Sequence, residues 1–126
     1  MDDDRQAIQA TVQLYLDGLY EGDAEKLAAS FHPTGALTYE SDGKIIILPR
    51  DEWLAAVRAR PSPQSQGLPR HDEILTIDQS SPTAAFVKLK CAIPPRFFTD
   101  YLSLLKVEGR WQVAQKVFAT RLDKAG

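Results

Sequence analysis

Two oppositely charged side chains, Asp100 and Lys116, stand in two runs of alternating residues near the end of the chain. The runs flank a Glu-Gly pair, a pattern typical of a β-hairpin. A two-residue turn would put Glu108 at positive φ, whereas a loop that starts one residue earlier requires positive φ only of Gly109. We therefore predict a three-residue loop, and this register sets Asp100 directly across from Lys116.

A cross-strand ion pair of this kind can serve two purposes. Beside a cavity the two charges can hold a ligand, and in a packed wall they can hold two strands together. Burying charges costs free energy that apolar residues would not lose, so the pattern alone leaves both interpretations open. The alternative hairpin register would set Tyr101 against Lys116 and turn Asp100 outward.

Both histidines stand apart from this pair. His71 begins a predicted strand, where an imidazole can act as an acid or base near neutral pH or remain solvated. His32 lies at the end of a helical pattern, before Pro33. The histidines lack the spacing of a metal site, and the chain has no glycine-rich phosphate loop, so we expect no metal or cofactor. The single cysteine, Cys91, shares a strand face with Leu89 and is expected to be a small buried side chain.

The elements that must position these residues are helices first and strands last. Residues 61–70 contain three prolines and one glycine, which predicts an exposed loop and a candidate lid. The order is typical of an α+β fold, in which helices cover one face of a mainly antiparallel sheet. The predicted helices are 3–21, a short one capped by Asp23, and 50–60; the predicted strands are 36–40, 44–48, 71–78, 83–93, 97–107 and 111–119.

Length and charge restrict the class of protein. A chain of 126 residues predicts one domain over residues 1–126. The net charge is −2 and no Lys/Arg cluster is present, so we expect neither a nucleic acid nor a membrane surface as partner. No apolar run is long enough to span a bilayer, and the acidic start differs from a signal peptide, which predicts a cytoplasmic protein.

Short motifs along the chain carry a family resemblance. They are Tyr15-Leu16-x-Gly18, Gly22-Asp23, Phe31-His32-Pro33, Asp42-Gly43, Arg50-x-Glu52-Trp53, Asp100-Tyr101-Leu102-x-Leu104-x-Lys106, Gly109-x-Trp111 and Lys116-Val117-Phe118. In these motifs the chain resembles the family named "putative lumazine-binding", within the nuclear-transport-factor-2-like superfamily, over roughly residues 3–119. The resemblance implies a cone, in which a curved sheet wraps three helices around an internal pocket, often with a dimer through the outer sheet face. Relatives include ketosteroid isomerases, scytalone dehydratase, polyketide cyclases and non-enzymatic binders, so the fold does not select a reaction.

The resemblance also implies positions for individual side chains. Ketosteroid isomerases place the tyrosine that donates to the enolate oxygen at the position of Tyr15, where a phenol could polarise a carbonyl or satisfy a buried neighbour. Tyr39 stands where those enzymes need their aspartate base, which argues against isomerase chemistry of that kind. By the same analogy Phe118 faces the pocket, and in the predicted register Asp100 and Lys116 face it too.

Three functions follow as hypotheses. The first is a dimeric binder of a small, largely apolar or planar molecule. The second is a cofactor-free lyase or isomerase with Asp100 as base and Tyr15 or Lys116 as electrophilic partner. The third is a non-catalytic dimeric module that uses an apolar outer sheet face. The predicted pocket residues are Tyr15, Tyr39, Trp53, Asp100, Leu102, Lys116 and Phe118, with His71 at the mouth, and the predicted outer face carries Ser103, Leu105, Trp111, Val113 and Val117.

Overall fold

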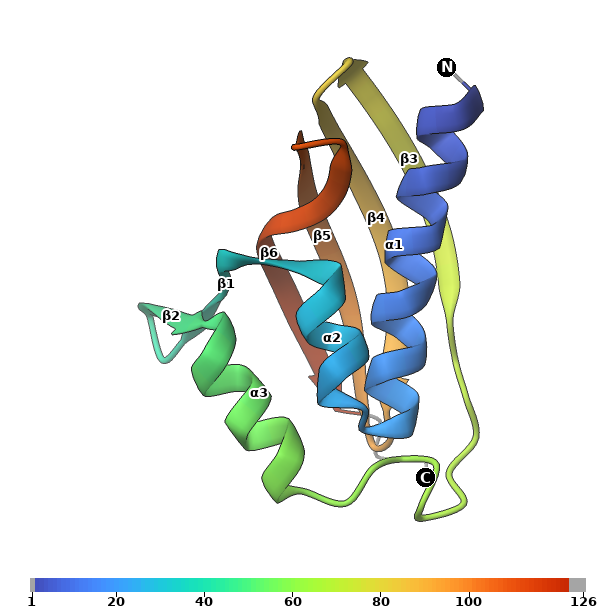
Figure 1. The fold of residues 1–126 in the computed structure, drawn as a ribbon. Coiled ribbons are helices and arrows are strands. Elements are labelled where there is room, and N and C mark those ends of the chain that lie inside the picture. Colours follow the sequence, from blue (N-terminus) through green and yellow to red (C-terminus); the bar gives the residue numbers. More distant parts are fainter. Residues whose placement is uncertain (1, 123–126) are drawn as a thin grey trace.

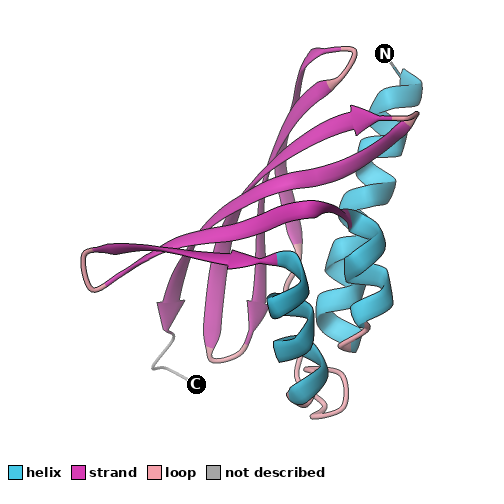
Figure 2. Ribbon diagram, turned by 60° about the vertical axis from the view of Figure 1, so that its left-hand side comes forward, coloured by secondary structure: helices cyan, strands magenta, loops and turns pink. Residues whose placement is uncertain are grey.

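The computed structural model describes residues 2–122 and has three helices and one sheet of six strands. The sheet is curved and the helices lie on one side of it (Figures 1 and 2), which confirms the predicted α+β cone. None of the described helices is long and apolar enough to cross a membrane. The elements are α1 (Asp2–Glu21), α2 (Ala24–Ser30), β1 (Phe31–Ser41), β2 (Lys44–Pro49), α3 (Arg50–Ala59), β3 (Glu73–Ser81), β4 (Ala84–Ile93), β5 (Arg96–Val107) and β6 (Arg110–Leu122).

The strand order is β2-β1-β6-β5-β4-β3, and each neighbouring pair is antiparallel except β1 and β6, which are parallel. This order places β5 and β6 in the middle of the sheet, where both edges of each strand are hydrogen-bonded. Residues on the inner face of these two strands lie against the helices and are shielded from water. A polar side chain on the inner face at the centre of the sheet therefore has the highest desolvation cost, and its presence there points to a function.

The two N-terminal helices pack closely because a residue of α1 that faces α2 has no side chain. A Cβ on Gly18 would lie 2.8 Å from Cδ2 of Leu27, so only glycine lets α2 approach α1 at this point. The Asp23 side chain accepts hydrogen bonds from the backbone amides of Glu25 and Lys26 and begins α2, as predicted. The buried stripe of α1 consists of Ile8, Val12, Tyr15, Leu16 and Leu19.

The turn of the closing hairpin differs from the prediction. Glu108 has φ 53° and Gly109 has φ 75°, and Val107 pairs directly with Arg110 across a two-residue turn. The predicted three-residue loop is therefore wrong. A two-residue turn with positive φ at both positions matches the right-handed twist of the strands, which outweighs the modest cost of placing a glutamate in the left-handed region.

One extra residue in β6 restores the predicted facing of the residues that follow it, although it does not restore the predicted pairing. Val113 pairs with Leu104 and Gln115 pairs with Ser103, so that Ala114 has no partner in the ladder. A bulge of this kind reverses which residues of the strand face inward beyond it.

The bulge divides the inner face of β6 into two parts. Before it, Trp111 and Val113 are buried, so the prediction that they face outward is wrong. Beyond it, Lys116 is buried and Phe118 is half-buried on the inner side, as expected. Lys116 pairs with Leu102 rather than with Asp100, which corrects the predicted register. Of the predicted outer face, Ser103, Leu105 and Val117 are exposed.

The proline-rich loop between α3 and β3 is fastened to the end of α1. The Gln64 amide donates to the Tyr20 carbonyl at 3.0 Å. Arg70 forms ion pairs with Asp17 of α1 at 2.6 Å and with Asp72 at 2.5 Å, and its guanidinium lies over the Tyr20 ring. In this structure the loop is held in place, and its action as a lid stays a prediction.

Candidate functional site

A polar cluster is buried between the sheet and α1. Its members are Tyr15 from α1, Asp100 from β5 and Lys116 from β6. Tyr15 and Asp100 are fully buried, and Lys116 is 5% exposed. Among the described residues, Ser30 completes the set of buried polar or charged side chains apart from the tyrosine. Two opposite charges thus occupy positions in the core where apolar residues would normally stand.

The two oxygens of Asp100 have different surroundings. Oδ2 accepts a hydrogen bond from the Tyr15 hydroxyl and one from the Cys91 thiol at 3.6 Å. Lys116 Nζ lies 3.7 Å from the same oxygen, within ion-pair range but beyond a hydrogen bond. Oδ1 is buried and has no hydrogen-bond partner among residues 2–122. An unsatisfied buried acceptor costs about 1–3 kcal/mol, which makes Oδ1 the candidate acceptor position of the cluster.

Aromatic rings surround the lysine of this cluster. Nζ of Lys116 lies 4.6 Å from the Phe118 ring centroid, 5.1 Å from that of Tyr15 and 5.5 Å from that of Trp53. Ring faces attract a cation electrostatically. The rings and Asp100 therefore hold the ammonium group at one point, although it makes no short hydrogen bond with any residue from 2 to 122.

Burial raises the pKa of Tyr15 well above its usual value, and the negative charge of Asp100 raises it further. The pKa of the Cys91 thiol is raised by the same two causes in the same order. Both side chains therefore stay neutral near neutral pH and act as hydrogen-bond donors. The cluster accordingly combines two neutral donors, one carboxylate and one ammonium group.

The structure brings together all but one of the predicted pocket residues. Leu102 is fully buried and pairs with Lys116, and the Tyr39 ring lies 5.1 Å from that of Phe118. His71 is the exception, because it is exposed and lies against Phe97, with ring centroids 5.4 Å apart.

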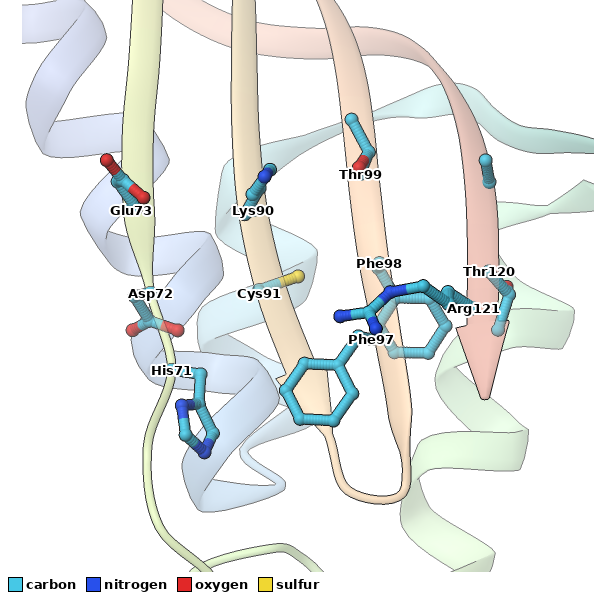
Figure 3. Close-up of a pocket in the computed structure, with 11 residues that line it drawn as sticks. His71, Asp72, Glu73, Lys90, Cys91, Phe97, Phe98, Thr99, Thr120 and Arg121 are labelled. Carbon is cyan, nitrogen blue, oxygen red and sulfur yellow. The ribbon is translucent and has the colours of Figure 1, made fainter. Parts of the chain in front are cut away.

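A pocket of about 420 Å³ lies elsewhere, at the end of strands β3 to β6 (Figure 3). In Figure 3 the helices lie behind the sheet, and His71, Phe97 and Arg121 lie in front of it. Lys90 and Thr99 pair across the strands on this outer face, whereas their neighbours Cys91 and Phe98 also border the pocket. The remaining lining residues are Asp72, Glu73, Ala119 and Thr120.

This pocket is not the one predicted inside the cone. Tyr15, Asp100 and Lys116 do not line it, and in this structure they are packed among other side chains. The two places are nevertheless adjacent. Cys91 borders the pocket, and its thiol donates a hydrogen bond to Asp100. Phe98 also borders the pocket, and its ring meets that of Phe118 edge-on, with ring centroids 5.9 Å apart. The pocket inside the cone stays a prediction.

Sequence reasoning misses the contribution of Cys91, whereas it does set Phe98 opposite Phe118 on the inner face, and the two rings do meet edge-on. The strand pattern predicts only a small buried side chain at Cys91, yet its thiol lies beside the aspartate. A signal for this exists in the strand pattern, since Cys91 pairs with Phe98, two residues from Asp100 on the same strand face. The tilted contacts of the Phe31 ring with Tyr15 and Trp53, at 5.9 and 5.0 Å, could not be seen in any local pattern.

Known proteins of similar sequence add to this geometry. The family model described as "Putative lumazine-binding" matches residues 3–119. The chain is also 26% identical over 117 residues to aldolase FrzH from Cladobotryum sp, covering 89% of this chain and 87% of that protein.

Solved structures of similar shape agree on the fold. An NTF2-like protein of unknown function from Shewanella baltica has a TM-score of 0.85, with 24% identity and 96% of each chain covered. One from Silicibacter pomeroyi has a TM-score of 0.82, with 20% identity and coverage of 95% of this chain and 98% of that one. A ketosteroid isomerase-like protein from Erwinia carotovora atroseptica has a TM-score of 0.72, with 19% identity and coverage of 94% and 96%. The solved structures share the fold of NTF2-like proteins with this chain. With the family match over nearly its whole length, this chain belongs to the putative lumazine-binding family.

Proposed function

We propose that this protein binds a small carbonyl compound at the Tyr15–Asp100–Lys116 cluster and moves a proton at the carbon next to the carbonyl. The observation that carries the proposal is the buried carboxylate of Asp100, which keeps one oxygen free beside a neutral phenol and an ammonium group. The names of an aldolase relative and a ketosteroid isomerase-like structure support carbonyl chemistry of this kind.

Each member of the cluster has a distinct task. Asp100 Oδ1 accepts the proton from carbon, because it has no other hydrogen bond to give up. As the proton leaves, negative charge develops on the carbonyl oxygen, and the Lys116 ammonium stabilises it at short range. The Tyr15 hydroxyl turns from Asp100 to the same oxygen, since its raised pKa keeps it protonated as a donor.

The substrate reaches the cluster by displacing aromatic side chains. Phe98 borders the pocket at the end of strands β3 to β6 and contacts Phe118, and the Phe118 ring covers Lys116 Nζ. Phe98 and Phe118 are only half-buried, so rotating their rings uncovers the lysine at lower cost than moving the core around Asp100. An apolar or planar substrate suits this aromatic path.

Deuterium exchange tests the proposal directly. Small ketones and aldehydes are incubated with the protein in deuterated buffer, and loss of the α-proton signal is followed by NMR. We expect exchange above the buffer rate for at least one compound, reduced by about 100-fold or more in Asp100→Asn. Asp78→Asn, at an exposed site on β3, is the matched control and should exchange like the wild type.

Three outcomes argue against this function. Exchange that persists in Asp100→Asn would remove the aspartate from the reaction. A compound that binds by native mass spectrometry but is never exchanged would leave the protein a binder without this chemistry. Absence of both binding and exchange across the panel would sink the proposal as a whole.

Association of two copies through the outer sheet face is part of the same proposal. Val117 pairs with Tyr101 on β5 and with Thr38 on β1, which in turn pairs with Ile47. Ile47, Val117 and Tyr101 are 64%, 47% and 38% exposed, so three large side chains of one row are exposed on β2, β6 and β5, with Thr38 of β1 between the first two. A twofold axis can bring this row against itself. Analytical ultracentrifugation should find a dimer that Val117→Lys disrupts, and a wild-type monomer at high concentration would refute it.

A further inference from the structure

We propose that Lys116 forms a covalent imine with the carbonyl substrate through Nζ. This inference rests on the proposed function, since it places the same class of compound beside the same three side chains. It narrows that class to aldehydes and ketones, because these condense with an amine to give an imine whereas esters and amides do not. It also changes the role of Lys116 from a fixed charge to a nucleophile.

The surroundings of Nζ are those of an amine that reacts outside bulk water. The side chain of Lys116 is 7% exposed, and three ring faces lie within 5.5 Å of the nitrogen. Its nearest carboxylate oxygen, at 3.7 Å, is too distant for a hydrogen bond. None of the hydrogen bonds among the described residues therefore has to break before the nitrogen can approach a carbon atom.

Asp100 supplies the proton acceptor that this amine needs. The rings and the carboxylate stabilise an ammonium in the resting protein, so the free amine has to form by proton transfer within the cluster. Oδ2 is already occupied by Tyr15 and Cys91, whereas Oδ1 is open. Nζ lies nearest Oδ2, at 3.7 Å, so the Lys116 side chain first has to turn toward Oδ1 before a proton can pass to it. That transfer neutralises two buried charges at once and relieves their desolvation cost.

The reaction then balances without a further reagent. The Nζ lone pair attacks the carbonyl carbon, the C–N bond forms, and the carbonyl oxygen takes the proton held by Asp100. Asp100 next takes a proton from the nitrogen and returns it to the departing hydroxyl, so that water leaves and a protonated imine remains. Asp100, again a carboxylate, removes the proton on the neighbouring carbon and leaves an enamine. Addition of water reverses these steps and restores the lysine.

Reductive trapping tests the imine. The full chain is incubated briefly with acetone and cyanoborohydride, which converts an imine into a stable secondary amine, and the product is located by peptide mass spectrometry. We expect the first adduct at Lys116, formed faster than at any exposed lysine. An adduct pattern in which Lys116 reacts no faster than the exposed lysines overturns the proposal.

Two variants make this test specific. Lys116→Arg keeps a positive charge between the rings and Asp100 but cannot form the imine, so the fast adduct should disappear while the thermal unfolding curve stays cooperative. Lys88→Met is the matched control. Lys88 also lies over an aromatic ring, 5.7 Å from the Tyr101 centroid, but on a position of β4 that alternates away from the cluster. Its loss should leave the adduct at Lys116 unchanged.

The imine and the proposed function can fail separately. Deuterium exchange that survives in Lys116→Arg, without a fast adduct in the wild type, overturns the imine and leaves the proton-transfer function standing. A fast adduct at Lys116 without exchange supports the imine and overturns that function. Absence of both adduct and exchange overturns both.

Discussion

At the scale of single residues, the site depends on a difference in hydrogen bonding between the two oxygens of Asp100. Tyr15 and Cys91 both donate to Oδ2, so their protons fix the carboxylate in one orientation and leave Oδ1 turned away from them. A carboxylate satisfied on both sides would be a structural anchor. With one side open, it keeps the capacity to accept a further proton.

Replacing Tyr15 with phenylalanine should measure how much the Tyr15 hydroxyl contributes to the stability of the fold. Tyr15→Phe keeps the ring but removes the hydroxyl, so that Oδ2 retains only the weak thiol donor. We expect the free energy of unfolding to fall by about 1–3 kcal/mol, measured by urea denaturation. Tyr101→Phe removes a hydroxyl from a 38% exposed side chain and should change stability by less than about 0.5 kcal/mol. Equal effects of the two substitutions would contradict a structural role for the Tyr15 hydroxyl.

At the scale of elements, the closing hairpin determines which residues meet. Its turn places Glu108 at φ 53°, a conformation that asparagine adopts at lower cost than glutamate. The bulge at Ala114 then sets the facing of Lys116. The site therefore depends on two backbone irregularities that lie eight or fewer residues from the lysine.

Substitutions in the turn should change stability in opposite directions. Glu108→Asn relieves the strain at positive φ and should stabilise the protein by about 0.5–1 kcal/mol. Gly109→Ala places a Cβ at φ 75°, and should destabilise it by about 1 kcal/mol although nothing lies within 4 Å of that Cβ. Urea unfolding measures both changes. A neutral Gly109→Ala would mean that the turn adjusts its backbone in solution.

The hairpin also indicates how far sequence reasoning reaches. Helix and strand positions follow from local periodicity and turn residues, and the structure agrees with nearly all of them. The pairing register of β5 and β6 does not follow from local sequence. The choice of turn at Glu108 depends on strand twist, and no local sequence pattern indicates the bulge at Ala114. The prediction that Lys116 faces inward is confirmed, but for a reason absent from its derivation: the shorter turn and the bulge offset each other.

At the scale of the whole molecule, α1 is fastened at both ends, to the sheet near its start and to the proline-rich loop near its end. Near its start, Asp4 accepts hydrogen bonds from Lys106 of β5 at 3.1 Å and from Trp111 of β6 at 3.2 Å. Near its end, Asp17 pairs with Arg70 of the loop that precedes β3. Tyr15 is thus presented to the cluster by a helix that cannot slide along the sheet without breaking these contacts.

Stability at high pH should report on the buried cluster. The pKa values of Tyr15 and Cys91 are raised in the folded protein above their usual values of 10.0 and 9.0. Their contribution to stability is therefore complete below about pH 9 and is lost at higher pH, where the unfolded chain releases these protons first. Urea midpoints measured up to about pH 11 should fall, and less steeply in Tyr15→Phe. Identical slopes in the wild type and the variant would contradict the burial of the phenol.

The extra residue in β6 has a consequence for comparing related chains. Without Ala114, Gln115 would follow Val113 in the ladder, and Lys116 would still pair with Leu102 on the same side of the sheet. A relative one residue shorter could thus carry the same lysine in the same place. An alignment that put its gap in the turn, where gaps are usually placed, would shift the residues from Arg110 to Val113 by one. Buried residues of one chain would then be aligned with exposed residues of the other. Deletions in this hairpin should accordingly be aligned at Ala114.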